Sequence, residues 1–262
     1  MKKIYSMQDI APTISNILAI PLPASAQGTA IPEITTALAG VQKVALLVPD
    51  ALGLFAYNLW KNEMPWFSSL YEDHGIIIQS VMKSITPINF ATMLTGTDLK
   101  GHGIAIRTND LLCESLFDVI RKQGGKSAGI GLNKYTGTEL LARYADIPGN
   151  AGDGTDDTIA EIIIKIATEH SPNFLIAQFG RVDDAFHKYG PSAPEIGPML
   201  KATDSRLQQT AATLTANGYG VIIHADHGQH DVIPAPPLGE GKRGTHGTEA
   251  DEDRLVPCIW IR

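Results

Sequence analysis

The stretch "YGVIIHADHGQH", residues 219–230, joins an apolar run to a cluster of acids and histidines. Its first half is rich in β-branched residues, which is typical of a strand buried on both faces. Its second half puts Asp226 and His227 side by side where the chain leaves the sheet, so their side chains can converge. Such a pair can bind a cation, whereas His224 and His230 fit supporting or surface positions better. The alternative is a polar loop that happens to be rich in histidine.

Apolar runs of the same kind recur along the chain and alternate with longer amphipathic segments. This alternation predicts an α/β fold with a largely parallel central sheet and helices on both faces. A length of 262 residues with 44% hydrophobic content favours one domain spanning residues 1–262. The predicted strands are 43–48, 75–81, 126–132, 173–179, 219–225 and 256–261, and the predicted helices are 111–123, 137–145, 156–170 and 195–217.

Composition excludes several classes of protein. The net charge of −7 argues against a protein that binds a nucleic-acid backbone, because such proteins carry concentrated positive charge. Cys113 and Cys258 stand in apolar surroundings, so we expect buried free thiols and neither a disulfide framework nor a thiolate metal cluster. A negatively charged ligand would therefore need metal ions or a few well-placed Lys and Arg residues.

No apolar run reaches the ~20 residues that span a bilayer, so we expect no membrane segment. The N-terminus resembles a signal peptide, but Gln8, Asp9 and Asn16 break up its apolar stretch, and three prolines interrupt it further. We therefore expect a retained, folded N-terminal segment and a cytoplasmic protein.

Polar residues also follow other predicted strands. Asp50 follows residues 43–48, and "GRVDDAFHKYG" follows residues 173–179. Ligands of open parallel sheets gather beyond the carboxyl ends of the strands, so these groups are expected to meet there. Asp183 and His187 are four residues apart and share one face of a helix, while Asp184 lies three residues from His187. Spacing alone leaves both acids available as ligands, and an isolated pair of this kind is more often a solvated turn.

A hydroxyl nucleophile is available in "SITPINFATMLTG", residues 84–96. Thr86 precedes Pro87, which is favoured in the first turn of a helix, so Thr86 fits a helix N-cap. It also fits a nucleophile placed where the helix N-terminus attracts a phosphate group.

Together, these motifs resemble the alkaline phosphatase superfamily, most closely its nucleotide pyrophosphatase/phosphodiesterase and phosphonoacetate hydrolase branches. The matching segments cover nearly the whole chain and keep their order, although each is short and weak alone. They are "VPDALG" with Asp50, Thr86 nine residues before "TG", "HGI" at 102–104, "DDAFHKYGP" from Asp183, "DHG" at 226–228 and "GTHG" with His246.

This resemblance implies two divalent metal ions, with zinc expected and manganese as the alternative. One ion would be held by Asp50, Thr86, Asp226 and His227, and the other by Asp183, His187 and His246. The metals would activate Thr86 as the nucleophile of a phosphoryl-transfer hydrolase and stabilise the leaving oxygen. The resemblance further implies a small-molecule phosphate ester or phosphonate as substrate.

The sequence departs from the family where the substrate would bind. Arg107 stands at the spacing where an Asn is common, with Asn109 two residues later. Arg can pair with two oxygens of a dianion, which favours a monoester or phosphonate over a diester, although an exposed surface Arg is an equal alternative. Lys134 follows a predicted strand and could hold an anionic substrate tail, or could simply be solvated. We expect Asn89, Asn109 and Lys134 to contact the substrate.

The order of segments differs as well. "DIAPTISNILAIPLPASAQGTAI", residues 9–31, is similar to a segment that superfamily members usually carry near the C-terminus. Its place at the start predicts a circularly permuted fold in which the segment within residues 1–40 packs close to the final strand.

Three rival functions remain. A phosphomonoesterase or phosphonate hydrolase is favoured by Arg107, and a sulfatase is disfavoured because the chain has no Cys-x-Pro-x-Arg segment. A non-catalytic metal-binding module would not need the hydroxyl of Thr86. The natural substrate and the oligomeric state cannot be read from these residues.

Overall fold

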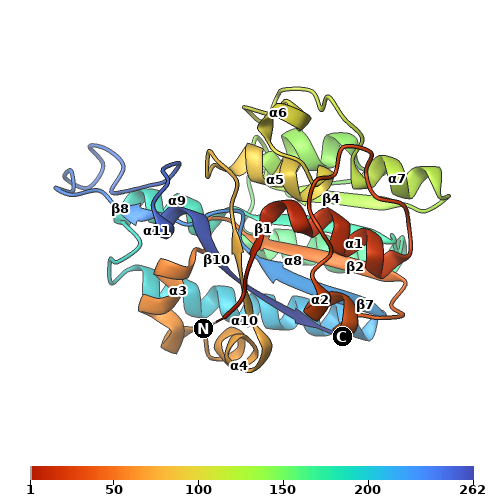
Figure 1. Cartoon of the computed structure of the whole chain (residues 1–262). Helices are drawn as coiled ribbons and strands as arrows, with labels where there is room; N and C mark the ends of the chain where they lie inside the picture. The colour runs from red at the N-terminus through yellow and green to blue at the C-terminus, as the bar shows by residue number, and fades with distance from the viewer. Residues whose placement is uncertain (1) are drawn as a thin grey trace.

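The computed structural model describes residues 2–262 and has one large sheet at its centre (Figure 1). The strand order in this sheet is β1-β3-β10-β7-β2-β6-β4-β5. Neighbouring strands are parallel except at β10, which runs antiparallel to β3 and to β7. The strands are β1 (Ile4–Ser6), β2 (Lys43–Pro49), β3 (Ile76–Gln79), β4 (Ser127–Gly131), β5 (Ile147–Asn150), β6 (Phe174–Phe179), β7 (Tyr219–His224) and β10 (Leu255–Ile261).

Helices cover both faces of the sheet, as predicted. In Figure 1, α1 and α2 lie in front of the sheet, while α8 and α10 lie behind it. The central strands β2, β6 and β7 are almost entirely buried, because both of their faces are covered. The helices are α1 (Ile10–Leu18), α2 (Pro32–Ala37), α3 (Leu54–Trp60), α4 (Pro65–His74), α5 (Thr86–Thr95), α6 (Leu99–His102), α7 (Leu116–Lys122), α8 (Asp156–Glu169), α9 (Arg181–Tyr189), α10 (Ile196–Ala216) and α11 (Asp251–Arg254).

The six predicted strands are all confirmed, and the strands that the sequence did not predict are short. β1 and β5 form the two edges of the sheet, where three or four residues give too little pattern to recognise. A separate antiparallel pair, β8 (His230–Asp231) and β9 (Gly244–Thr245), closes the base of a loop. We call residues 232–243 the projecting loop, because they extend away from the sheet beyond β8 in Figure 1.

The segment predicted as a helix at 137–145 is a π-helix over Gly137–Ala142. It packs unusually close to β4, since a Cβ atom on Gly131 would lie 2.5 Å from the Cα of Gly137. The backbone N–H of Gly137 donates a hydrogen bond to Oε1 of Gln178 at the end of β6. This contact ties the π-helix to the carboxyl ends of the strands.

The N-terminal segment is part of the core. Ser6 and Asp9 form a reciprocal capping box at the 3₁₀ turn Met7–Asp9, which leads directly into α1. Ile10 and Ile14 in α1 are fully buried, and the helix packs against α2, α5 and β2. Residues 4–18 therefore contribute a strand and a helix to the fold.

The two ends of the described chain lie at the same side of the molecule (Figure 1). A shallow hollow between them is lined by Lys3, Glu33, Trp260 and Arg262, and Arg262 Nη1 donates to the carbonyl oxygen of Ala39 at 2.8 Å. This proximity fits a permuted fold, although α1 itself lies over β2 and not beside the final strand. The permutation stays a prediction.

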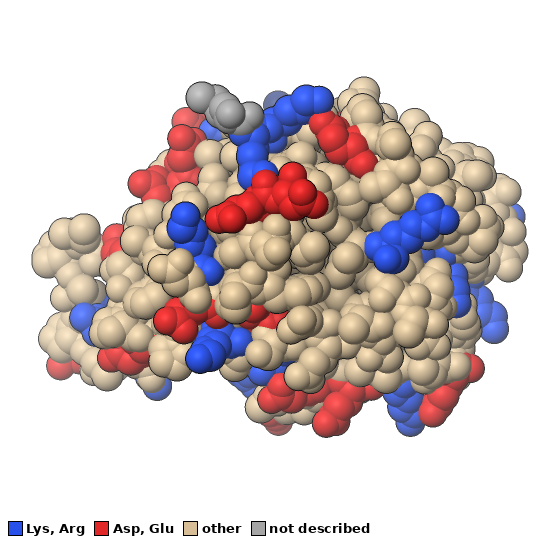
Figure 2. Space-filling view, turned by 90° about the horizontal axis from the view of Figure 1, so that it is seen from below, with Lys and Arg blue, Asp and Glu red and all other residues tan. Residues whose placement is uncertain are grey.

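The surface charge is mixed on the side seen from below. Figure 2 shows Lys and Arg side chains interspersed with Asp and Glu side chains over this face. Within residues 2–262, none of the helices combines the length and apolar character needed to cross a membrane. Cys113 and Cys258 are both free thiols; Cys258 is buried in β10 as expected, whereas Cys113 is only half-buried.

Candidate metal centre

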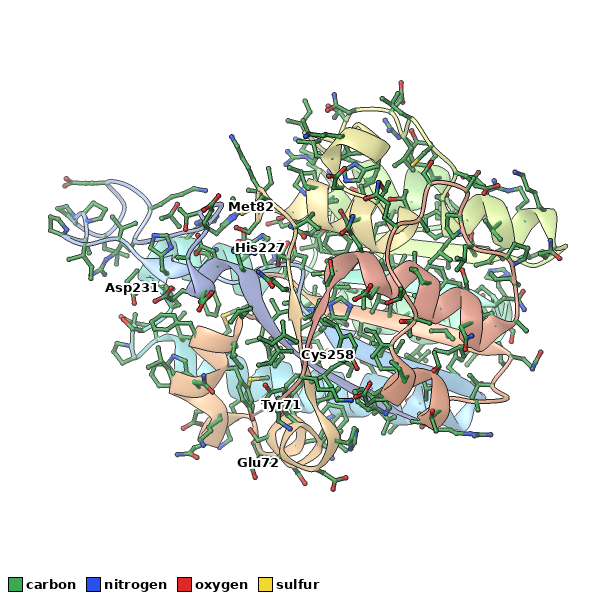
Figure 3. All side chains as sticks on the ribbon, viewed as in Figure 1. Tyr71, Glu72, Met82, His227, Asp231 and Cys258 are labelled. Carbon is green, nitrogen blue, oxygen red and sulfur yellow. The ribbon has the colours of Figure 1, made fainter. Side chains whose placement is uncertain are left out.

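Acids and histidines meet at the carboxyl ends of the parallel strands. Asp50 follows β2, and Asp226 with His227 follows β7. Nε2 of His227 lies 3.3 Å from Oδ2 of Asp226 and 3.6 Å from Oδ1 of Asp50. Figure 3 labels His227 at the end of the sheet nearest α5, and Asp231 further out where the projecting loop begins. The polar residues that follow β2 and β7 therefore lie close together, as expected.

The two buried carboxylates lack sufficient partners. Oδ1 of Asp50 and Oδ2 of Asp226 are buried and have no hydrogen-bond donor among the described residues. Burial and then the nearby charges of Asp226 and Asp183 raise the pKa of Asp50 well above its ordinary value, and burial raises the pKa of Asp226. Buried carboxylates without partners are costly, so this arrangement fits a bound cation. Asp50, Asp226 and His227 could each offer it one ligand atom.

A second group of ligand atoms adjoins the first. Asp183, His227 and His246 also lie close enough to share one ion. Nε2 of His246 is 3.7 Å from Oδ1 of Asp183, and the His227 and His246 rings stack with centroids 3.9 Å apart. Burial, followed by the neighbouring His227, lowers the pKa of His246 to about 3, so its imidazole is neutral at pH 7. A neutral imidazole is the form that binds metals.

The backbone sets the orientation of three histidines. Nδ1 of His227, His246 and His187 contacts the carbonyl oxygen of Gly228, Ser84 and Gly244 respectively, at 2.8–3.0 Å. A carbonyl oxygen only accepts, so each Nδ1 carries the donated hydrogen. When the ring is neutral, its lone pair is on Nε2, as in metal-binding histidines whose other nitrogen donates to a carbonyl group.

The two adjacent aspartates of α9, which spacing could not distinguish, have different partners. Asp183 faces the site, where Nε2 of His187 lies 3.4 Å from its Oδ2. Asp184 instead accepts hydrogen bonds from Tyr135 at 2.6 Å and from Arg181 at 2.9 Å. The geometry therefore favours Asp183 as the ligand. His187 is less well placed than expected, because its Nε2 accepts from the ammonium group of Lys242 at 3.0 Å.

Thr86 is the first residue of α5 and does not cap it. The residue at the N-cap position is Ile85, and this helix has no side-chain capping bond. Oγ1 of Thr86 lies 3.1 Å from Nε2 of His227, so the hydroxyl faces the two groups of metal-type ligands. The functional interpretation of Thr86 thus has a geometric basis that the capping interpretation lacks.

An open cleft of about 380 Å³ leads to Thr86. Arg107, Lys134 and Lys242 contribute exposed positive side chains to its lining, and Asp183 and His187 contribute ligand-type groups. Lys134 has a positive φ of 66°, a backbone conformation that is unfavourable for a residue with a side chain. Such strained residues cluster at functional sites.

Both predicted asparagines have mainly local roles. Asn89 is fully buried, accepts from the N–H of Val81 at 2.9 Å and donates to carbonyl groups of the β3–α5 loop. It therefore holds the loop that precedes Thr86 and does not line the cleft. The side chain of Asn109 accepts from the backbone N–H groups of Ala105 and Ile106, which shapes the turn that carries Arg107.

The remaining histidines support the fold around the site. His224 is buried in β7, and burial lowers its pKa to about 4. His230 contacts the buried carboxylate of Asp253 at 2.7 Å, and Asp253 also accepts from the N–H and hydroxyl groups of Thr248. His102 is buried beside Thr92 and has no place in the cleft lining.

Sequence reasoning missed three polar residues near the site. Gln178 donates to Asp50, Gln229 donates to Asp183, and Lys242 contacts His187. Only Gln178 carried a usable signal, because a polar side chain near the end of an otherwise apolar strand calls for a buried partner.

The backbone is also constrained at this edge of the sheet. A Cβ atom on Gly228 would lie 2.1 Å from the carbonyl oxygen of Glu252, so the "DHG" turn requires glycine. Ala51, directly after Asp50, has a positive φ of 65°, and its N–H donates to Oδ1 of Asp226 at 3.2 Å. These features hold the two carboxylates together despite their mutual repulsion.

The fold and the site define an α/β protein with a candidate metal centre at the strand ends. The sequence profile of the type I phosphodiesterase / nucleotide pyrophosphatase family matches residues 106–238, just over half of the chain. The chain belongs to this family.

Individual relatives are distant. The human ectonucleotide pyrophosphatase/phosphodiesterase family member 5 is 24% identical over 216 residues, which cover 71% of this chain and 45% of the human protein. The chain thus spans less than half the length of this curated relative.

Two solved structures have a similar fold. A murine ectonucleotide pyrophosphatase/phosphodiesterase 5, an inactive Thr→Ala variant in complex with AMP, has a TM-score of 0.62 and 14% identity over 82% of this chain and 87% of its own. Phosphonoacetate hydrolase from Sinorhizobium meliloti 1021, in complex with phosphonoacetate, has a TM-score of 0.58 and 18% identity over 74% of this chain and 59% of its own. At these identities the likeness extends to the fold alone.

Proposed function

We propose that the protein is a two-metal phosphoryl-transfer hydrolase in which Thr86 is the nucleophile. The observation that carries this proposal is the position of the Thr86 hydroxyl, 3.1 Å from Nε2 of His227, whose neighbours Asp50 and Asp226 each have one carboxylate oxygen without a donor. A threonine with only a structural role would not need to lie beside metal-type ligands. Family membership and the inactive Thr→Ala variant of the murine relative support the same role.

The residues fit the two metal ions that the resemblance implies. Asp50, Asp226, His227 and Thr86 would hold one ion, while Asp183, His246 and His187 would hold the other. Zinc suits this mixture of imidazole and carboxylate ligands, and manganese is the alternative. When bound, the ions would favour the ionised form of the Thr86 hydroxyl and stabilise negative charge on the phosphoryl group and the leaving oxygen.

The bonds that form and break in the reaction involve Thr86, the substrate and water. Thr86 loses its proton and its Oγ1 forms a bond to phosphorus, while the bond from phosphorus to the leaving oxygen breaks and that oxygen takes up a proton. A water oxygen then bonds to phosphorus while the bond from phosphorus to Oγ1 breaks, a proton from the water restores the hydroxyl of Thr86, and the phosphoryl group leaves as phosphate or its monoester. The N-terminus of α5 favours an anionic group at this position, because its backbone dipoles point toward the phosphoryl oxygens.

The substrate is proposed to be a small phosphate ester, with diester or pyrophosphate cleavage favoured by the family. The named ligands of the similar structures, AMP and phosphonoacetate, are also small anions. Arg107 and Lys134 in the cleft lining favour the second candidate, a phosphomonoesterase or phosphonate hydrolase, since they add two positive charges where a substrate would lie.

The test is to assay zinc-loaded and manganese-loaded protein with nitrophenyl phosphate and bis-nitrophenyl phosphate. We expect hydrolysis of at least one substrate, which Thr86→Ala abolishes and Thr86→Ser partly retains. Equal activity of the parent protein and Thr86→Ala would rule out the nucleophile. Absence of turnover with all metals tested would favour a non-catalytic metal-binding module.

A further inference from the structure

Lys242 lies in an unusual place for a lysine. It belongs to the projecting loop, yet its ammonium group donates a hydrogen bond to Nε2 of His187 at 3.0 Å. Nδ1 of the same imidazole contacts the carbonyl oxygen of Gly244 at 2.8 Å. Because that nitrogen must donate, the lone pair of the neutral ring is on Nε2, and Lys242 takes it.

The base of the projecting loop is fixed close to α9. The N–H of Arg243 donates to the carbonyl oxygen of His187 at 2.8 Å, and the N–H of Val232 donates to that of Arg243 at 2.8 Å. The pairing of β8 with β9 secures both ends of the loop. The backbone directly after Lys242 is therefore held beside His187, while the Lys242 side chain is exposed.

A lone pair can serve one partner at a time. His187 shares the face of α9 with Asp183, whose Oδ1 approaches His246. A divalent ion held by Asp183, His246 and His187 would need the lone pair that Lys242 uses, and it would also repel the ammonium charge. His187 can therefore bind the metal ion or accept the hydrogen bond from Lys242, but it cannot do both at once.

We propose that Lys242 competes with the second metal ion for His187, so that the metal binds only by expelling the lysine. This inference rests on the proposed two-metal function. Lys242 lines the cleft together with Thr86, so the expelled ammonium group stays at the cleft. The competition weakens the second site selectively, because the Asp50 and Asp226 carboxylates have no contact with Lys242. The protein then gains its second ion only when the free metal concentration is high enough.

The affinity test compares the parent protein with Lys242→Met, which removes the ammonium group and keeps a long side chain. Lys188→Met is the matched control, since Lys188 adjoins His187 on α9 but places its ammonium group over the Tyr189 ring. Metal-free proteins are titrated with zinc alone against a chelating indicator. We expect Lys242→Met to bind the second ion about tenfold or more tightly than the parent. Lys188→Met and Lys242→Arg should stay close to the parent, and the first site should be unchanged in all four proteins.

A second readout follows the lysine itself. Trace acetylation of the parent protein with mass-spectrometric detection reports how reactive each amine is, with or without zinc. Release of Lys242 should increase its labelling severalfold on zinc loading, whereas the labelling of Lys188 should stay constant.

The outcomes separate the inference from the function on which it rests. Two ions bound with equal affinity in the parent and Lys242→Met, with Lys242 labelling unaffected by zinc, would overturn the competition and leave the two-metal function intact. One ion in the parent and two in Lys242→Met would support the competition in its strongest form. Binding of a single ion in both proteins would overturn the competition and the two-metal proposal together.

Discussion

Thr86→Ala separates the two interpretations of this residue. The substitution removes the contact between Oγ1 and Nε2 of His227, but it removes no helix cap, since α5 has no side-chain capping bond. The loss of one hydrogen bond costs about 1 kcal/mol of unfolding free energy. For a chain of this size, the melting temperature should fall by roughly 2–4 °C. Turnover should fall on the order of a thousandfold or more, because the variant lacks the hydroxyl beside Nε2 of His227 that would form the covalent intermediate.

Two measurements on the same preparations test this prediction. Thermal unfolding of the metal-free proteins gives the stability change, and kcat with the preferred nitrophenyl ester gives the catalytic change. Rapid quenching of the parent and mass spectrometry should find a phosphoryl group on the peptide that contains Thr86. A variant that keeps nearly parental kcat while losing stability would refute the nucleophile and restore a purely structural role.

Three further predictions concern the cleft, the core and pH. Arg107→Asn should lower kcat/KM for the monoester more than for the diester, and an unchanged ratio of the two would make Arg107 a bystander. Ile14→Ala should lower the unfolding free energy by about 2–5 kcal/mol in urea, because Ile14 is fully buried in α1, whereas Asn16→Ala on the exposed side should have little effect. Burial lowers the pKa of His102 from 6.5 to about 4, so the unfolded chain takes up a proton in this range that the folded chain does not. The His102 contribution to stability should therefore be complete above pH 6.5 and decline by up to about 3 kcal/mol as the pH falls to 4. Urea titrations of the parent and His102→Gln should show a smaller loss in the variant, and parallel pH profiles would contradict this assignment.

The sequence predicted the central part of the fold because its strands are buried on both faces. Residues 43–48 and 173–179 are mostly apolar runs, and both became central strands within one residue of the expected bounds. β1 and β5 escaped prediction because they are short edge strands that need little apolar pattern. The π-helix at Gly137–Ala142 depends on close approach to the glycines of β4, which only the folded chain provides.

The site was predictable as a set of strand ends, but its details depend on tertiary contacts. Spacing left Asp183 and Asp184 equivalent, and the choice between them follows from the hydrogen bonds that Tyr135 and Arg181 make to Asp184. We expected Asn89 to contact the substrate, but its side-chain amide forms hydrogen bonds with the backbone of the β3–α5 loop. Lys242 gave no signal at all, because "GEGKRG" has the composition of a solvated loop.

The central claim is that the strand ends hold two metal ions beside Thr86. Anomalous diffraction from crystals of the zinc-loaded protein tests it most directly. We predict two peaks roughly 4 Å apart. One should lie among Asp50, Thr86, Asp226 and His227, and the other among Asp183, His187 and His246, with Lys242 turned away from His187. A single peak, or peaks bound by other residues, would contradict the account.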